Sequence, residues 1–260
     1  LATLGAEAME AGIRTVTFVD VGSATDSVTV AAAFTADLTV NLDSDGTSKT
    51  NTVSAAAYTG SLTVKVNESD FDGATNVLTG GTGNDHLLIT ADAGGAGTVT
   101  GLTDIENITV VGDAAAFAFT GHNNNADDGT TITVDASSMS SGTYAATLNM
   151  AAELDAAVVI KGGAGADVLT ISGSDLAESV TAGAGDDNIV YASASLTNID
   201  VIDGGAGTDT MMQLDDTAMV DADFTNVTNV EVLSANAAGI NTLATLGAEA
   251  MEAGIRTVTF

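Results

Sequence analysis

Four short segments of the chain combine glycine and aspartate in an order that suits calcium binding. They are 80–88 (GGTGNDHLL), 162–170 (GGAGADVLT), 182–190 (AGAGDDNIV) and 204–212 (GGAGTDTMM). Their glycines let the backbone turn tightly and present carbonyl oxygens, the aspartate at the sixth position offers a carboxylate, and the apolar residue two places later begins a strand. Oxygen ligands of this kind favour Ca²⁺ over zinc or copper. The segments therefore predict calcium-binding turns.

The candidate metal-binding residues are the glycines and the sixth-position aspartate of each segment. They are Gly80, Gly81, Gly83, Asp85, Gly162, Gly163, Gly165, Asp167, Gly183, Gly185, Asp187, Gly204, Gly205, Gly207 and Asp209.

These segments resemble the nonapeptide repeats of the RTX, or haemolysin-type calcium-binding, family. The resemblance implies a right-handed parallel β-roll, with Ca²⁺ ions between stacked turns held by the motif aspartates and by backbone carbonyls. It also implies type I secretion of the unfolded chain. The likeness is specific in the four segments and extends loosely over residues 76–233.

The spacing of the segments departs from that family, in which nonapeptides usually follow one another directly. The last three begin at residues 162, 182 and 204, which predicts one motif per coil. We therefore expect calcium turns along one edge only, with mixed turns such as 172–178 and 192–198 opposite. The three turns predict two sandwiched sites, and Asp85 is more isolated, since neighbouring windows carry Asn76 and Val99 in the aspartate position.

Two further acidic turns, 41–46 (NLDSDG) and 68–73 (ESDFDG), are similar to the start of an EF-hand loop. Both lack its closing glutamate, because the twelfth position is Thr52 or Thr79. Asp-Gly pairs commonly form simple turns, which is the plainer interpretation.

Short runs rich in Val, Ile, Leu and Thr predict the strands that must position these turns. The predicted strands are 14–19, 27–30, 38–42, 62–66, 86–90, 105–111, 131–134, 146–150, 157–160, 168–171, 188–190, 200–202 and 230–233. One helical stretch is expected at 4–12. The absence of proline from the sequence suits strands that are paired on both sides. The predicted fold is an all-β parallel solenoid, or β-roll, of stacked coils with little helix.

The composition limits which classes of partner the chain can bind. The sequence has 35 acidic and 5 basic residues and a net charge of −30, while 45% of its residues are hydrophobic. Scattered single Lys and Arg residues exclude nucleic acid as a natural partner and disfavour anionic membranes. No apolar run approaches the roughly 18 residues of a membrane span. Cations are the expected partners, and a core of small aliphatic side chains should let the chain fold.

Residues 1–18 are identical to residues 243–260. Such an offset is the sequence signature of a tandem array, so 1–242 is interpreted as one repeat and 243–260 as the start of the next. The expected partner is therefore the chain itself, as neighbouring repeats or a homopolymer, and cell-surface glycans are a second class of partner.

The sequence indicates no enzyme. His86 and His122 are its only histidines, and no HExxH, GxSxG or P-loop motif occurs. Met211 and Met212 are interpreted as core residues. The predicted function is a structural repeat of a secreted, calcium-stabilised extracellular filament, surface layer or giant adhesin. Two alternatives are an adhesion module that binds a glycan or protein, and the calcium-binding tail of a secreted enzyme.

Overall fold

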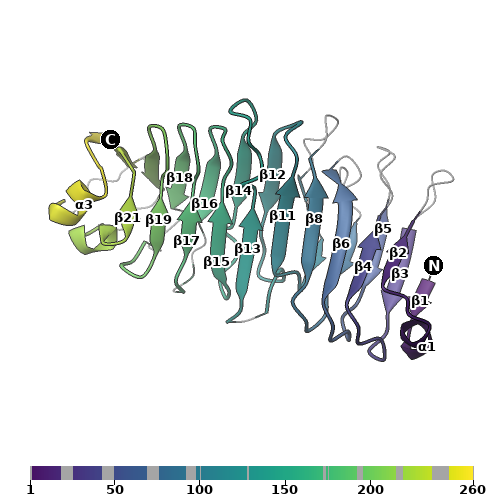
Figure 1. Ribbon diagram of the computed structural model, residues 1–260. Coiled ribbons are helices and arrows are strands. Elements are labelled where there is room, and N and C mark those ends of the chain that lie inside the picture. Colours follow the sequence, from purple (N-terminus) through teal and green to yellow (C-terminus); the bar gives the residue numbers. More distant parts are fainter. Residues whose placement is uncertain are drawn as a thin grey trace.

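The computed structural model is a rod of stacked parallel coils with its two termini at opposite ends (Figure 1). It describes residues 2–18, 26–42, 50–68, 76–91, 98–99, 101–127, 129–171, 174, 176–191, 196–214, 219–235 and 246–259. Every strand pair is parallel. The expected all-β parallel solenoid is therefore confirmed.

Three sheets build the rod, and we name them A, B and C. Sheet A contains β1 (Ala2–Leu4), β3 (Asp26–Val30), β5 (Asn51–Ser54), β7 (Val77–Thr79) and β10 (Leu102–Thr103). Sheet B contains β2 (Thr15–Thr17), β4 (Leu38–Asn41), β6 (Leu62–Asn67), β8 (His86–Thr90), β11 (Asn107–Val111), β13 (Thr131–Asp135), β15 (Ala157–Lys161), β17 (Ser179–Thr181), β19 (Val201–Asp203) and β21 (Val227–Thr228). Sheet C contains β9 (Thr98–Val99), β12 (Phe117–Thr120), β14 (Ala146–Asn149), β16 (Val168–Ile171), β18 (Asn188–Tyr191), β20 (Thr210–Gln213), β22 (Val232–Ala235) and β23 (Thr257–Thr259).

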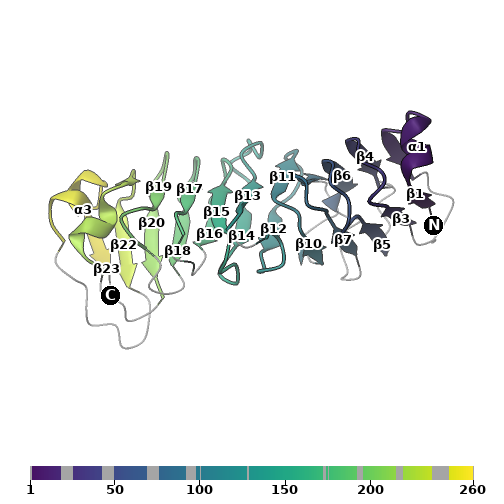
Figure 2. The same cartoon turned by 90° about the horizontal axis from the view of Figure 1, so that it is seen from below.

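Sheets A and C share the face opposite sheet B, with A over the N-terminal coils and C over the C-terminal coils (Figure 2). Helical segments are short: α1 (Ala6–Glu10), the 3₁₀ helix η1 (Asp221–Phe224) and α3 (Ala248–Glu252). The helix expected at 4–12 is α1. Within the described residues, no helix is long and apolar enough to cross a membrane.

The core consists of apolar ladders that run along the rod between the two faces. Alternate residues of each strand point inward, so one inward position repeats from coil to coil. In sheet B this ladder is Val16, Val40, Val64, Leu87, Ile108, Val134, Ile160, Val180, Ile202 and Val227. In sheet C it is Phe119, Leu148, Leu169, Ile189, Met211, Leu233 and Val258. Each face contributes one layer of mostly aliphatic side chains to the interior, and the two layers together form the core.

The turns form two edges of the rod. The first edge leads from a strand of sheet A or C to the next strand of sheet B, and the second edge leads from a strand of sheet B to the next strand of A or C. Two successions differ, because β9 of sheet C is followed by β10 of sheet A, and β22 is followed by β23 in the same sheet. The turn 80–85 lies on the first edge, between β7 and β8. The turns 162–167, 182–187 and 204–209 lie on the second edge. The expectation of calcium turns on one edge only is therefore wrong, because the motif specifies a turn followed by a strand but not which sheet that strand joins.

Candidate calcium-binding turns

The three motif turns of the second edge stack at the distance of backbone contact. Ala184 donates its backbone N–H to the Gly163 carbonyl at 2.9 Å, and Ala206 donates to the Gly183 carbonyl at 2.9 Å. A Cβ atom added to Gly183 would collide with the Gly163 carbonyl oxygen, and one added to Gly205 would collide with that of Gly183. Glycine is thus required here because the neighbouring coil occupies the space of any side chain.

The motif aspartates form a ladder of hydrogen bonds at the starts of the strands. The backbone N–H of Asp167 donates to Asp187 Oδ1 at 2.7 Å, and that of Asp187 donates to Asp209 Oδ1 at 2.9 Å. All four motif aspartates are at most 1% exposed. Each carboxylate therefore satisfies a backbone donor of the preceding coil, a structural role that operates without any metal.

Two glutamates extend this ladder. Glu231 Oε2 accepts the Asp209 N–H at 2.9 Å on the second edge, and Glu106 Oε2 accepts the Asp85 N–H at 2.7 Å on the first edge. Sequence analysis missed both because neither lies in a glycine-rich segment. Their signal was spacing: each stands about one coil after a motif aspartate and directly before a strand.

The four motif turns divide into two kinds according to the second carboxylate oxygen. Asp85 Oδ2 accepts the Gly81 N–H at 2.5 Å, and Asp167 Oδ2 accepts the Gly163 N–H at 2.6 Å. We call these the closed turns. Asp187 Oδ2 and Asp209 Oδ2 are buried and have no hydrogen-bond partner among the described residues. We call 182–187 and 204–209 the open turns.

The backbone explains the difference. In the open turns Gly183, Gly185, Gly205 and Gly207 have φ angles of 110°, 122°, 93° and 149°, whereas the glycines of the closed turns have no positive φ. Only glycine adopts such angles readily. In the closed turns the glycine at the second position of the motif, Gly81 or Gly163, donates its N–H to the motif aspartate. In the open turns Gly183 and Gly205 hold the same position and do not donate to the free Oδ2 of their motif aspartates.

Burial and like charge raise the pKa values of the open-turn aspartates. Burial and the nearby Asp167, Asp209 and Asp186 raise the pKa of Asp187 to about 7, although the Asp167 N–H opposes the shift. The pKa of Asp209 is also raised, first by burial and then by Glu231 and other acids. The two adjacent coils thus hold two desolvated carboxylates, and a cation bound beside either one would stabilise its charged form.

The donor set of this site fits Ca²⁺. Within the described residues no three His, Cys, Asp or Glu side chains converge, so a cation there would take its other ligands from the carbonyl oxygens of the glycine turns. Asp187 and Asp209 each have a free oxygen to offer. Asp85 and Asp167 would first have to lose the hydrogen bond from Gly81 or Gly163.

The remaining sequence candidates lie elsewhere or have structural roles. In the two EF-hand-like turns, residues 43–49 and 69–75 are outside the described part of the chain. Asn76 accepts the Asn51 N–H on its Oδ1 at 2.8 Å, so it fills the capping role of the aspartate without the charge. The Val99 side chain is likewise not described.

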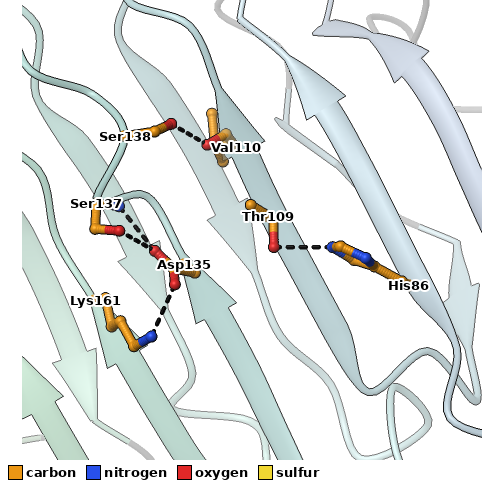
Figure 3. Close-up of polar contacts among 7 residues, drawn as sticks. All are labelled: His86, Thr109, Val110, Asp135, Ser137, Ser138 and Lys161. Atoms are coloured by element: carbon orange, nitrogen blue, oxygen red, sulfur yellow. Dashed lines mark hydrogen bonds and ion pairs between the residues drawn. The ribbon is translucent and has the colours of Figure 1, made fainter.

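Two separate side-chain pairs link neighbouring strands of sheet B, one at His86 and one at Lys161 (Figure 3). His86 Nε2 lies 2.9 Å from Thr109 Oγ1, and Lys161 Nζ lies 2.9 Å from Asp135 Oδ2. Burial alone would raise the pKa of Asp135, but hydrogen bonds from Ser137 and Lys161 lower it. These contacts hold neighbouring coils together.

A separate group of buried acids lies on the first edge. The Glu178 N–H donates to Asp200 Oδ1 at 3.0 Å, and both residues are at most 2% exposed. Burial and the adjacent Asp200 raise the pKa of Glu178 to about 9. Neither residue lies in a glycine-rich segment, so only their place in the coil identifies them.

Comparison with known proteins agrees with the motif turns. The family profile of the RTX calcium-binding nonapeptide repeat matches four copies within residues 72–88, 156–170 and 197–212. The segment 182–190 lies outside these ranges although its turn stacks between two that are matched. No curated protein and no solved structure matches the chain. The chain is thus a parallel β-solenoid that carries RTX calcium-binding nonapeptide repeats.

Proposed function

We propose that the chain is a structural repeat of a secreted protein whose rod is stabilised by Ca²⁺, as in an extracellular filament, a surface layer or a giant adhesin. The observation that carries this proposal is the pair of open turns, where Asp187 Oδ2 and Asp209 Oδ2 are buried without a partner. Nonapeptide repeats of this kind are known calcium binders, and a divalent cation would compensate both carboxylates at once.

Calcium acts in this proposal by completing the fold. Without it, the carboxylates of successive coils repel one another, and ordering the glycine-rich turns costs much conformational entropy. When Ca²⁺ binds, Asp187 and Asp209 are held as carboxylates and the glycine turns present their carbonyls to the ion. Binding free energy then becomes folding free energy.

The net charge of −30 supports an extracellular setting. Free Ca²⁺ is abundant outside cells, so an unfolded, self-repelling chain would fold after export. RTX repeat proteins are generally secreted. The partners in this proposal are neighbouring copies of the repeat.

Calcium removal tests the proposal. Far-UV circular dichroism and thermal melting are measured in EGTA and again after Ca²⁺ or Mg²⁺ is added at equal ionic strength. We expect Ca²⁺ to raise the melting temperature far more than Mg²⁺, because Mg²⁺ gives up its hydration water reluctantly. A β-sheet signal and melting temperature that chelation leaves unchanged would refute a calcium-dependent fold.

The structure gives little support to the alternative function as an adhesion module. An exposed aromatic platform would favour glycan binding, but Phe117, Phe119 and Phe224 are at most 1% exposed and belong to the core. The enzyme-tail alternative depends on a catalytic domain elsewhere, and a longer gene that held only further copies of this repeat would contradict it.

A further inference from the structure

The duplicated segment occupies opposite ends of the rod and has different partners at each end (Figure 1). At the N-terminal end its strand, β2, is the first strand of sheet B and pairs with β4. At the C-terminal end the same sequence forms β23, the last strand of sheet C, and pairs with β22. One sequence therefore fits both the beginning and the end of the solenoid.

The two pairings use opposite edges of the strand backbone. In the N-terminal copy, the Arg14 carbonyl accepts the Thr39 N–H at 2.9 Å and the Phe18 N–H donates to the Asn41 carbonyl at 3.0 Å. In the C-terminal copy, Arg256 and Thr257, which correspond to Arg14 and Thr15, donate their N–H groups to the Glu231 carbonyl at 2.9 and 3.1 Å. Within a strand, alternate residues address alternate neighbours, and at the start of this strand the first copy uses the Arg14 carbonyl while the last copy uses the Arg256 N–H. The two sets of bonds use different backbone groups and are therefore compatible in a single strand.

The core ladders meet at the same residue. Val16 begins the ladder of sheet B beside Val40, and its counterpart Val258 ends the ladder of sheet C beside Leu233. The same side chain points to the interior in both copies. Val258 is 36% exposed at the open end, so a following coil would cover it.

The short helix also uses complementary faces in the two copies. In the C-terminal copy Ala250 and Ala253 are at most 2% exposed, whereas Met251 is 63% exposed. In the N-terminal copy no residue of α1 is buried, but Met9, the counterpart of Met251, receives the N–H and hydroxyl of Thr35 on its sulfur, each at 3.4 Å. The C-terminal copy thus buries the alanine face that the N-terminal copy leaves at least partly exposed, and Met9 is partly buried where Met251 is exposed.

An acidic cap completes the C-terminal arrangement. Asp221 of η1 accepts the N–H groups of Gly247 at 2.7 Å and Ala250 at 3.1 Å, so it caps the N-terminus of α3. The N-cap residue of each helix is a glycine, Gly5 or Gly247, which has no side chain to cap with. In the N-terminal copy, no equivalent of Asp221 is present among the described residues. The coil before the segment therefore supplies the Asp221 cap, which only the C-terminal copy has. The coil after the segment supplies the Thr35 contact, which only the N-terminal copy has.

We propose that successive repeats share this segment as one helix and one strand, so that the solenoid continues from repeat to repeat and sheet C of one repeat becomes sheet B of the next. The partner surface at each end is a second copy of this repeat. The shared strand is hydrogen bonded on both edges, and its helix is covered by η1 on one side and by the coil around Thr35 on the other.

This joint also reassigns the edges of the rod. Because sheet B of the following repeat takes the face of sheet C, the first edge of that repeat continues the second edge of the preceding one. The 80–85 turn of each following repeat then lies on the same edge as the turns that contain Asp167, Asp187 and Asp209 in the preceding repeat. In an array of repeats, the 80–85 turn would therefore lie on the same edge as the other motif turns.

Hydrogen exchange in saturating Ca²⁺ tests the joint. The protein is a two-repeat chain, residues 1–242 followed directly by 1–260, and exchange at single amides is measured by NMR. At the outer ends we expect alternate protection, with Phe18 slow and Thr15 fast in the first copy, and Thr257 slow and Val258 fast in the last copy. At the internal copy, consecutive amides of the strand should all exchange at least about tenfold more slowly than an unpaired amide. Alternate protection at the internal copy would overturn the proposal.

A variant of the cap separates the joint from general stability. Asp221→Asn in the first repeat should speed exchange of the internal helix amides by about tenfold or more, while the exposed control Glu252→Gln at the same joint should not. Equal effects of the two variants would contradict the claim that the preceding coil holds the shared helix. Since Ca²⁺ is saturating throughout, failure of the joint is distinguishable from failure of calcium binding.

Discussion

At the level of single residues, the motif aspartates fall into two kinds that the motif itself does not distinguish: those whose Oδ2 accepts a hydrogen bond and those whose Oδ2 lacks a partner among the described residues. Asp187→Asn keeps an acceptor for the Asp167 N–H but removes the charge beside the free Oδ2 position. We expect this variant to melt at or above the wild-type temperature in EGTA, because a buried charge is lost, and to lose most of the rise that Ca²⁺ produces. Calorimetry with and without Ca²⁺ measures both effects.

The closed turn at Asp167 provides a matched comparison. Both of its carboxylate oxygens already accept N–H groups, from Ala146 and Gly163. Asp167→Asn should therefore destabilise the chain even in EGTA, by about 1–3 kcal/mol for the donor left without an acceptor. The exposed variant Glu10→Gln controls for the loss of one negative charge. If Asp167→Asn and Asp187→Asn behave alike in EGTA, the distinction between closed and open turns is wrong.

The buried Glu178 predicts a dependence on pH that is separate from calcium. Burial and Asp200 raise its folded-state pKa to about 9, above an ordinary value of 4.5. The folded chain then holds a proton that the unfolded chain has released, so stability falls as pH rises through this interval. We expect the melting temperature in EGTA to fall between pH 7.5 and about 9, and Glu178→Gln to flatten that decline. An unchanged slope in the variant would assign the decline to other groups.

At the level of elements, close stacking makes the turn glycines sensitive to any side chain. Gly205 has a φ of 93° and a Cβ there would collide with the Gly183 carbonyl, whereas Gly129 has a φ of 74° with open space around it. Gly129→Ala should cost about 1–2 kcal/mol from backbone strain alone. Gly205→Ala should cost clearly more, because the neighbouring coil must also move. Urea unfolding in Ca²⁺ compares the two, and similar losses would show that stacking adds nothing to strain.

The strands were largely predictable because their inward positions are strongly apolar. Each predicted strand overlaps an observed one, for example 62–66 with β6 and 168–171 with β16. The strands that sequence analysis missed include β5 (NTVS), β12 (FAFT) and β17 (SVT). Each has only one or two inward apolar residues among polar or small ones, so its pairing depends on strands a whole coil away rather than on local pattern.

The residues of the candidate site were predictable from the sequence, but which turns are closed and which are open was not. The segments 162–167 and 182–187 have nearly the same letters, and the Gly163 and Gly183 carbonyls both accept an N–H from the next coil. They differ in the N–H of that glycine, because Gly163 donates to Asp167 Oδ2, whereas Asp187 Oδ2 has no partner among the described residues. The two open turns also pair with each other across the coils, through the bridge between Ala184 and Ala206. No local reading of a nonapeptide contains that information.

At the level of the whole molecule, each coil contacts only its neighbours, so stability behaves as a sum of coil and interface terms. The open turns 182–187 and 204–209 lie toward the C-terminal end of the rod (Figure 1). A ligand that stabilises these coils protects adjacent coils through shared interfaces, and its effect weakens with distance along the rod. The acidic charge of the chain acts everywhere, and simple salt would screen it without such a gradient.

Hydrogen exchange read by mass spectrometry tests this spatial pattern. We expect Ca²⁺ to slow exchange most in β16, β18 and β20, less in β13 and β14, and least in β4 and β6, because protection by a bound ion is local before it is global. NaCl at the same ionic strength should slow exchange more evenly. The double variant Asp187→Asn and Asp209→Asn should remove the calcium-specific gradient and keep the salt effect. If Ca²⁺ instead protects β4 and β6 as strongly as β18 in the wild-type chain and in the double variant, the ion acts through general charge screening rather than through the open turns.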